Sequence, residues 1–265
     1  MYIDHWGMAV DPFASEAGSW CFESSDARLA MSKVKHSVMT RGICLLSGEP
    51  GTGKTMAARQ CLSKLGKSEF KVCYTAFPML RSTEFLKMLA QSLGLKAAGR
   101  KAALFQQIRS CIAGMAESNV TPVLCLDECQ RLDSQSLLDL MAVTSFEMDS
   151  KKLASIVMIS DSSFSEILGM RIHESFRQRI TSNYKFQGLA RSECAAYLED
   201  GMRSAGGREG VFLPEAIEAL HNASMGRVRT FNSLVSRCLI VGSQRKLANV
   251  TKAEVAEASD DYELG

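Results

Sequence analysis

The sequence lacks the features that direct a chain into or across a membrane. Its first twenty residues contain acids and have no basic segment leading into an apolar core, so they do not form a signal peptide. No apolar run approaches the roughly 20 residues that a membrane-spanning helix requires. The sequence therefore predicts a cytoplasmic protein with no direct membrane insertion.

Paired cysteine motifs are also absent. The nine cysteines include no Cys-x-x-Cys spacing, and the closest two, Cys125 and Cys129, have no histidine near them in the sequence. We expect reduced, mostly buried thiols, as is usual in the cytoplasm.

A strong net charge is missing as well. The formal charge of +2 gives no global attraction to nucleic acid, so any such attraction must come from local patches. The sequence contains no helix-turn-helix, zinc-finger or RNA-binding signature, so any DNA contact would be with phosphates and not with base edges. With no internal repeat, 265 residues and 46% hydrophobic content suit one α/β domain plus a smaller appendage.

A glycine-rich loop is the clearest motif present. The stretch "GEPGTGKT" follows an apolar run typical of a buried strand and precedes a segment with helical spacing. Glycines let the backbone N–H groups close around phosphates, and the helix N-terminus adds partial positive charge. Lys54 would reach the β- and γ-phosphates and Thr55 would ligate Mg²⁺. The loop therefore predicts ATP and Mg²⁺ as cofactors, with nucleotide contacts from Gly48, Glu49, Pro50, Gly51, Thr52, Gly53, Lys54, Thr55 and Met56.

Adjacent acids end a second apolar strand, "TPVLCLDECQ". Asp127 would hold Mg²⁺, directly or through water, and Glu128 would orient and deprotonate the attacking water. Taken alone, such a strand can equally end in two solvated acids. Its pairing with the glycine-rich loop favours a catalytic pair.

Strand-like and helix-like segments alternate up to about Gly188, which predicts an α/β fold with a mostly parallel sheet between helices. One of these helices, "STEFLKMLAQSLGL", opens with Ser82 as its expected N-cap. Beyond Gly188 the pattern becomes successive helices. The predicted division is a leader over 1–39, a P-loop core over 40–187, a small all-helical lid over 188–258 and a frayed tail over 259–265.

Five stretches in this order carry a family resemblance: "DPFAS", "LLSGEPGTGKT", "LCLDECQRL", "FRQRI" and "GRVRTFN". The chain resembles AAA+ ATPases of the ExeA-like group, and its layout is similar to transposition-regulator ATPases such as MuB, TnsC and TniB. The resemblance implies ATP hydrolysis that is slow and stimulated by assembly. It also implies that Asp11, Pro12 and Phe13 border the adenine, although an aromatic near a chain start equally often fills a core.

The resemblance assigns roles to three arginines. Arg179 would be an arginine finger that enters the site of a neighbouring subunit, with Arg177 as a close rival, and Arg229 would touch the phosphates as sensor 2. Guanidinium groups suit charge that develops on a transferred phosphoryl group. Solvated helix charge or local ion pairing is the alternative for each.

One position departs from the family pattern. Where a polar sensor 1 residue is expected, the chain has Ser160 followed by Asp161. Ser160 would orient water, whereas a carboxylate facing the γ-phosphate would be repelled. Capping of the next helix together with Ser162 is one role for Asp161, and the sequence leaves its role open. Slow hydrolysis is a reasonable consequence.

Two tasks suit such an ATPase. In the first, ATP assembles subunits into a ring or filament on double-stranded DNA, the assembly recruits or stimulates a transposase, and hydrolysis drives disassembly. In the second, an ExeA-like ATPase assists assembly of a secretion complex at the inner membrane. ExeA-like secretion proteins carry a transmembrane segment and a further domain after the ATPase, whereas this sequence ends at Gly265, so the sequence favours the DNA task. A binding module with little turnover is a third possibility.

A small basic cluster is the candidate DNA contact. Lys96, Arg100 and Lys101 stand close together between two predicted helices, and Arg81 precedes the first of these helices. Phosphate contacts by such residues would be independent of base sequence and sensitive to salt. An ordinary solvated loop is the competing interpretation.

Overall fold

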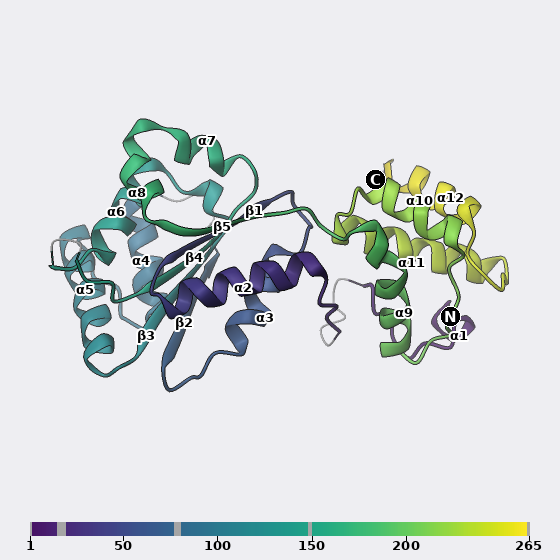
Figure 1. The fold of residues 1–265 in the computed structure, drawn as a ribbon, viewed down its shortest axis with the longest axis horizontal. Helices are drawn as coiled ribbons and strands as arrows, with labels where there is room; N and C mark the ends of the chain where they lie inside the picture. Colours follow the sequence, from purple (N-terminus) through teal and green to yellow (C-terminus); the bar gives the residue numbers. More distant parts are fainter. Residues whose placement is uncertain (1, 15–19, 77–80, 148–149, 264–265) are drawn as a thin grey trace. The chain divides into compact units, whose positions relative to one another are not determined.

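The computed structural model describes residues 2–14, 20–76, 81–147 and 150–263 and divides into two compact units (Figure 1). The core unit comprises Leu29–Glu49 and Lys54–Phe186. The helical unit comprises Met1–Arg28, Pro50–Gly53 and Gln187–Gly265. The leader up to Arg28 thus groups with the C-terminal helices.

A five-stranded parallel sheet forms the centre of the core unit (Figure 1). The strand order is β2-β3-β4-β1-β5, and every neighbouring pair is parallel. All the strands therefore end at one edge of the sheet, which confirms the predicted α/β class. The strands are β1 (Ile43–Gly48), β2 (Phe70–Ala76), β3 (Thr121–Asp127), β4 (Ser155–Ile159) and β5 (Ile180–Phe186).

Helices connect these strands, as parallel pairing requires. The longer ones are α3 (Lys54–Ser63), α4 (Ser82–Ser92), α5 (Lys101–Glu117) and α6 (Ser134–Thr144), and the shorter ones are η1 (Cys129–Arg131), α7 (Phe164–Gly169), η3 (Arg171–His173) and α8 (Glu174–Gln178). A further helix, α2 (Ser25–Met39), precedes β1.

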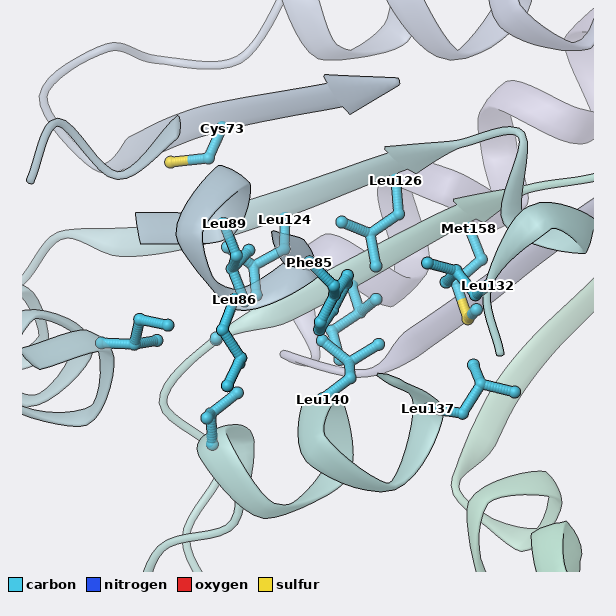
Figure 2. Packing of buried hydrophobic residues seen from close by; sticks show 14 of the residues in the cluster. Cys73, Phe85, Leu86, Leu89, Leu124, Leu126, Leu132, Leu137, Leu140 and Met158 are labelled. Atoms are coloured by element: carbon cyan, nitrogen blue, oxygen red, sulfur yellow. The ribbon is translucent and has the colours of Figure 1, made fainter. Parts of the chain in front are cut away.

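Alternate residues of the central strands face opposite helical layers. All seven residues of β3 are buried. Leu124 and Leu126 pack with leucines and a phenylalanine of α4 and α6 in one cluster, whereas their neighbours Val123 and Cys125 are buried outside that cluster (Figure 2). Because side chains of a strand alternate between faces, the sheet is covered on both sides.

Phe85 of α4 is fully buried in this cluster (Figure 2). We expect Phe85→Ala to destabilise the core unit by about 3–5 kcal/mol, because the substitution removes buried contacts and leaves a cavity. Urea unfolding monitored by far-UV circular dichroism measures the change in the free energy of unfolding. Leu29→Ala, at a side chain that is 55% exposed, is the matched control and is expected to shift the midpoint little.

The start of α4 differs from its prediction. Arg81 occupies the N-cap position without a side-chain cap, and Ser82 is the first helical residue. Its hydroxyl instead donates to Asp139 of α6 at 2.5 Å, and Lys101 of α5 lies 2.6 Å from the same carboxylate. Although burial alone would raise it, hydrogen bonds from Lys101, Ser82 and Gln135 hold the pKa of Asp139 below its usual value. Asp139 thus ties three helices together, which explains why the serine does not cap its own helix.

The helical unit contains α1 (Tyr2–His5), η4 (Arg191–Glu193), α9 (Cys194–Ser204), α10 (Pro214–Ser224), α11 (Val228–Gln244) and α12 (Lys252–Glu263). Trp6 is fully buried in its core and donates its indole N–H to the carbonyl of Leu239 at 2.8 Å. Residues 259–263 continue α12, where the sequence predicts a frayed tail, because Val255 and Ala258 anchor this helix in the core. Residues 264–265 of that tail lie outside the described residues.

In the described part of the chain, no helix has both the length and the apolar character needed to cross a membrane. Seven of the nine cysteines are buried. Burial raises the pKa of the thiols, to about 12 for Cys44 and Cys125, so these side chains are protonated at neutral pH.

Candidate functional site

The glycine-rich loop joins the end of β1 at Gly48 to the start of α3 at Lys54. Gly48, Gly51 and Gly53 have backbone φ values of 143°, 80° and 101°. Residues other than glycine rarely adopt φ values in this region. A Cβ atom at Gly48 would also lie 2.9 Å from the carbonyl oxygen of Phe186. The loop conformation therefore depends on its glycines, as a phosphate-binding loop requires.

Lys54 points back into the mouth of this loop. Its ammonium group donates to the carbonyl oxygens of Gly48 and Glu49 at 2.8 Å each. Burial lowers the pKa of Lys54, while the nearby carboxylates of Glu128 and Asp127 act in the opposite direction. This places a largely buried cation where the motif expects the β- and γ-phosphates.

Asp127 lies at the end of β3 and is 5% exposed. Its Oδ2 atom accepts hydrogen bonds from Thr55 Oγ1 at 3.1 Å and from the Tyr74 hydroxyl at 3.0 Å. The structure thus brings together Thr55 and Asp127, the two residues that the sequence assigns to Mg²⁺. Tyr74 is a third member that no sequence motif indicates, because its contact depends on how β2 pairs with β3.

The donor set fits Mg²⁺. Proteins usually bind this ion through one or two carboxylates together with water and substrate phosphates. Within the described ranges, no group of three or more histidine, cysteine, aspartate or glutamate residues is suited to hold a metal by itself. A hydroxyl and one buried carboxylate beside a phosphate-binding loop agree with an ion that arrives with its nucleotide.

Glu128 turns away from β3 in a left-handed conformation, with φ 59° and ψ 39°. A non-glycine residue in this conformation costs roughly 1–3 kcal/mol, and the surrounding structure must hold it there. Its Oε2 atom accepts a hydrogen bond from Gln130 Nε2 at 2.8 Å, and Gln130 Oε1 accepts the backbone N–H of Asp161 at 3.2 Å. Gln130 therefore links Glu128 to the segment after β4, a role that no sequence motif indicates.

Ser160 and Asp161 have different environments at the end of β4. Ser160 is 2% exposed, and its hydroxyl has no hydrogen-bond partner in the described part of the chain. Asp161 accepts hydrogen bonds from Ser163 N at 2.9 Å and Ser163 Oγ at 2.5 Å. It thus closes the turn before α7, with Ser163 as its partner and not Ser162, which donates to Glu49 instead.

Arg177 and Arg179 lie on or directly after α8. Arg177 donates to the carbonyl of Leu168 at 2.9 Å, and Arg179 donates to Ser145 Oγ at 2.8 Å. Ile180 pairs with Ile43 at the start of β1, whereas the glycine-rich loop follows the end of that strand. Five residues of parallel strand separate the two ends by about 17 Å, so Arg179 does not reach the loop of its own chain.

The leader residues of the "DPF" stretch lie in the core of the helical unit. Asp11 accepts hydrogen bonds from Phe13 N at 2.9 Å and Ser236 Oγ at 2.7 Å. Pro12 is buried, and Phe13 is 2% exposed and packs against the rings of Trp20 and Tyr197. The side chain of Phe13 therefore fills this core, the alternative that the sequence left open.

Arg229 is the second residue of α11 and is exposed. Its backbone N–H donates to the carbonyl of Gly51 at 3.0 Å, and a Cβ atom at Gly51 would lie 2.9 Å from Arg229 Cβ. Both residues belong to the helical unit. The proposed sensor arginine is thus joined through its backbone to the glycine-rich loop.

The three residues of the predicted DNA cluster differ in their surroundings. Lys96 and Arg100 are exposed, and Arg100 is the N-cap of α5. Lys101 is engaged by the buried carboxylate of Asp139. Only part of the predicted cluster is therefore available as a free basic surface.

A glycine-rich loop between β1 and α3, with an acidic pair at the end of β3 in a parallel sheet, defines a P-loop nucleoside triphosphatase. Residues 36–168 match the family model described as AAA domain. The chain belongs to this family and is an ATP hydrolase.

A curated relative and several solved structures resemble the chain over nearly its whole length. The general secretion pathway protein A of Aeromonas hydrophila is 29% identical over 269 residues, which cover 100% of this chain and 48% of the relative. The chain thus spans about half the length of that relative.

Two solved structures share the fold at low sequence identity. Cdc6p of Pyrobaculum aerophilum has a TM-score of 0.75 at 15% identity. This match covers 96% of this chain and 72% of the Cdc6p chain. The ORC2 protein of Aeropyrum pernix, solved as ADPNP–ADP complexes, has a TM-score of 0.69 at 14% identity. This match covers 94% of this chain and 71% of the ORC2 chain. The general secretion pathway protein A supports the ExeA-like part of the resemblance, whereas the two solved structures support only the fold. The similarity to transposition regulators is not shown.

Proposed function

We propose that this chain is an ATPase module that assists the assembly of a secretion complex at the inner membrane. The observation that carries this proposal is the alignment of the entire chain with a general secretion pathway protein A at 29% identity. The order of preference between the two tasks considered from the sequence is thereby reversed, because a transposase partner has no comparable support.

The glycine-rich loop and the residues at or directly after the ends of β3 and β4 supply the chemistry. Lys54 and the N–H groups of the glycine-rich loop bind the phosphates, and Thr55 and Asp127 hold Mg²⁺, which offsets negative charge on the phosphates when bound. Glu128 takes a proton from the attacking water. The hydroxyl of Ser160, which follows the neighbouring strand β4 and has no hydrogen-bond partner among the described residues, is the group that orients this water.

Self-association completes the proposed site. Because Arg179 lies at the edge of the sheet opposite the loop of its own chain, it acts on a nucleotide held by a neighbouring subunit. Arg229, at the start of α11, is the expected sensor 2 residue and contacts the glycine-rich loop through the carbonyl of Gly51 within the helical unit. Repetition of the contact between subunits that Arg179 makes generates a ring or a filament. Hydrolysis would then release the assembly after its task.

We expect deletion of the gene in the source organism to reduce assembly of the secretion complex in isolated membranes. Complementation with the parental gene restores assembly, whereas Lys54→Ala does not, because the variant cannot bind the nucleotide phosphates productively. Immunoblots of complex components in membrane fractions, together with the amount of secreted protein, measure the outcome. A deletion strain with a normal secretion complex and normal secretion would contradict the proposal.

DNA binding distinguishes the proposal from transposase regulation. ATP-loaded protein is expected not to form multimers on double-stranded DNA of unrelated sequences at low salt. Filter binding and electron microscopy measure this directly. Salt-sensitive assembly on DNA that is lost in the Lys96→Glu, Arg100→Glu variant would favour the transposase alternative. Lys101 is left unchanged in this test because it supports Asp139.

A further inference from the structure

A single carboxylate oxygen of Asp127 accepts hydrogen bonds from hydroxyl groups of two different elements. Thr55 of α3 and Tyr74 of β2 donate to its Oδ2 atom at 3.1 and 3.0 Å, and the backbone N–H of Glu128 donates to its Oδ1 atom at 2.9 Å. The glycine-rich loop motif accounts for Thr55. Tyr74 belongs to no motif, so its hydrogen bond to the metal carboxylate requires its own explanation.

The strand register explains why a tyrosine is suited to this position. In the β2–β3 pair, Tyr74 lies opposite Cys125, and Ala76 lies opposite Asp127. With neighbouring strands about 4.8 Å apart and about 3.3 Å per residue, the Cα atoms of Tyr74 and Asp127 are about 8 Å apart on one face. A short hydroxyl side chain such as serine does not span this diagonal, whereas a phenol does.

The ring of Tyr74 contributes little to the core. The residue is 53% exposed, and Val72, which precedes it on the same face of β2, is 40% exposed. Tyr74 and Thr55 form part of the wall of a largely apolar cavity of about 680 Å³ beside α3 and β2. Because the ring is not needed to fill a packed interior, the hydroxyl contact with Asp127 is the main interaction that the side chain supplies.

We propose that Tyr74 is a positioning residue that orients the Asp127 carboxylate toward the bound metal. This inference rests on the assignment of Thr55 and Asp127 as ligands of Mg²⁺ in the proposed function. Mg²⁺ demands near-ideal octahedral geometry, and hydrogen bonds to a ligating carboxylate fix its orientation. Tyr74 and the Glu128 N–H hold the carboxylate from outside, so that Oδ2 does not rotate away from the Thr55 hydroxyl.

Tyr74→Phe removes only the hydroxyl and tests this role. Loss of such a supporting hydrogen bond typically costs 10–100-fold in metal affinity, and we expect Mn²⁺ to bind the ADP complex at least about tenfold more weakly. Electron paramagnetic resonance of free Mn²⁺ measures this affinity without any turnover. The Mg²⁺ concentration for half-maximal ATP hydrolysis should rise by a similar factor, while kcat at saturating Mg²⁺ and ADP affinity in EDTA stay near the parental values.

Val72→Ala is the matched control, because it removes apolar atoms from the same face of β2 and is expected to leave Mn²⁺ affinity unchanged. Parental Mn²⁺ affinity in Tyr74→Phe would overturn the proposal, and so would a fall in kcat at saturating Mg²⁺ with unchanged metal affinity. Asp127→Asn separates the two assignments. If that variant also keeps parental Mn²⁺ affinity, the metal site itself is wrong; if it alone loses affinity, only the role of Tyr74 is.

Discussion

Glu128→Gln should bind ATP and Mg²⁺ like the parental protein and hydrolyse ATP about 10²–10⁴-fold more slowly, the range that a general base contributes. The amide keeps the size of the side chain and is able to retain a hydrogen bond with Gln130, but it does not accept a proton from water. ATP-bound assemblies should therefore accumulate. Steady-state phosphate release and size-exclusion chromatography with light scattering measure the two effects.

Two further variants make this result specific. Glu166→Gln, an exposed acid on α7, should hydrolyse ATP at the parental rate. Asp127→Asn should lose Mg²⁺-dependent binding as well as turnover, because Asp127 contacts Thr55 in the proposed metal site. If Glu128→Gln hydrolyses ATP at the parental rate, another group deprotonates the water.

Arg179→Ala should bind ATP almost normally and hydrolyse it about 10³–10⁵-fold more slowly, as expected for loss of an arginine supplied by a neighbouring subunit. Mixing this variant with Lys54→Ala should restore part of the activity. In the mixture, Arg179 of a Lys54→Ala subunit completes the intact site of an Arg179→Ala subunit. Phosphate release at several mixing ratios measures the rescue.

Arg171→Ala is the matched control, since Arg171 is exposed on η3, which directly precedes α8, whereas Arg179 directly follows α8. It should hydrolyse ATP normally. Arg177→Ala tests the rival residue, and loss of activity there with a normal Arg179→Ala would transfer the role to Arg177. Mixed assemblies that form, as shown by pull-down of differently tagged subunits, but show no rescue would mean that Arg179 does not act across subunits.

The local parts of the site could be predicted from the sequence because their chemistry is contained in short stretches. A glycine-rich loop between a strand and a helix predicts both its backbone shape and the positions of Lys54 and Thr55. The parallel sheet also follows from alternating strand and helix patterns. The class of fold and the ATP hydrolase activity could therefore be predicted from the sequence alone.

Contacts between distant segments could not be predicted from the sequence. Tyr74 meets Asp127 only through the β2–β3 register, and the sequence pattern does not specify which residues pair. Ser82 has the residue type of a helix cap, but Asp139 binds its hydroxyl instead. The sheet order, likewise, is what shows that Arg179 and the glycine-rich loop lie at opposite ends of β1 and β5.

In the proposed function, ATP is hydrolysed at sites that a neighbouring subunit completes. Turnover per subunit, measured at saturating ATP and Mg²⁺ over a wide range of protein concentration, tests this claim most directly. We predict that turnover per subunit rises steeply over the concentration range in which light scattering detects multimers. A turnover per subunit that stays constant from monomer to multimer would contradict the account, because each chain would then contain its whole catalytic site.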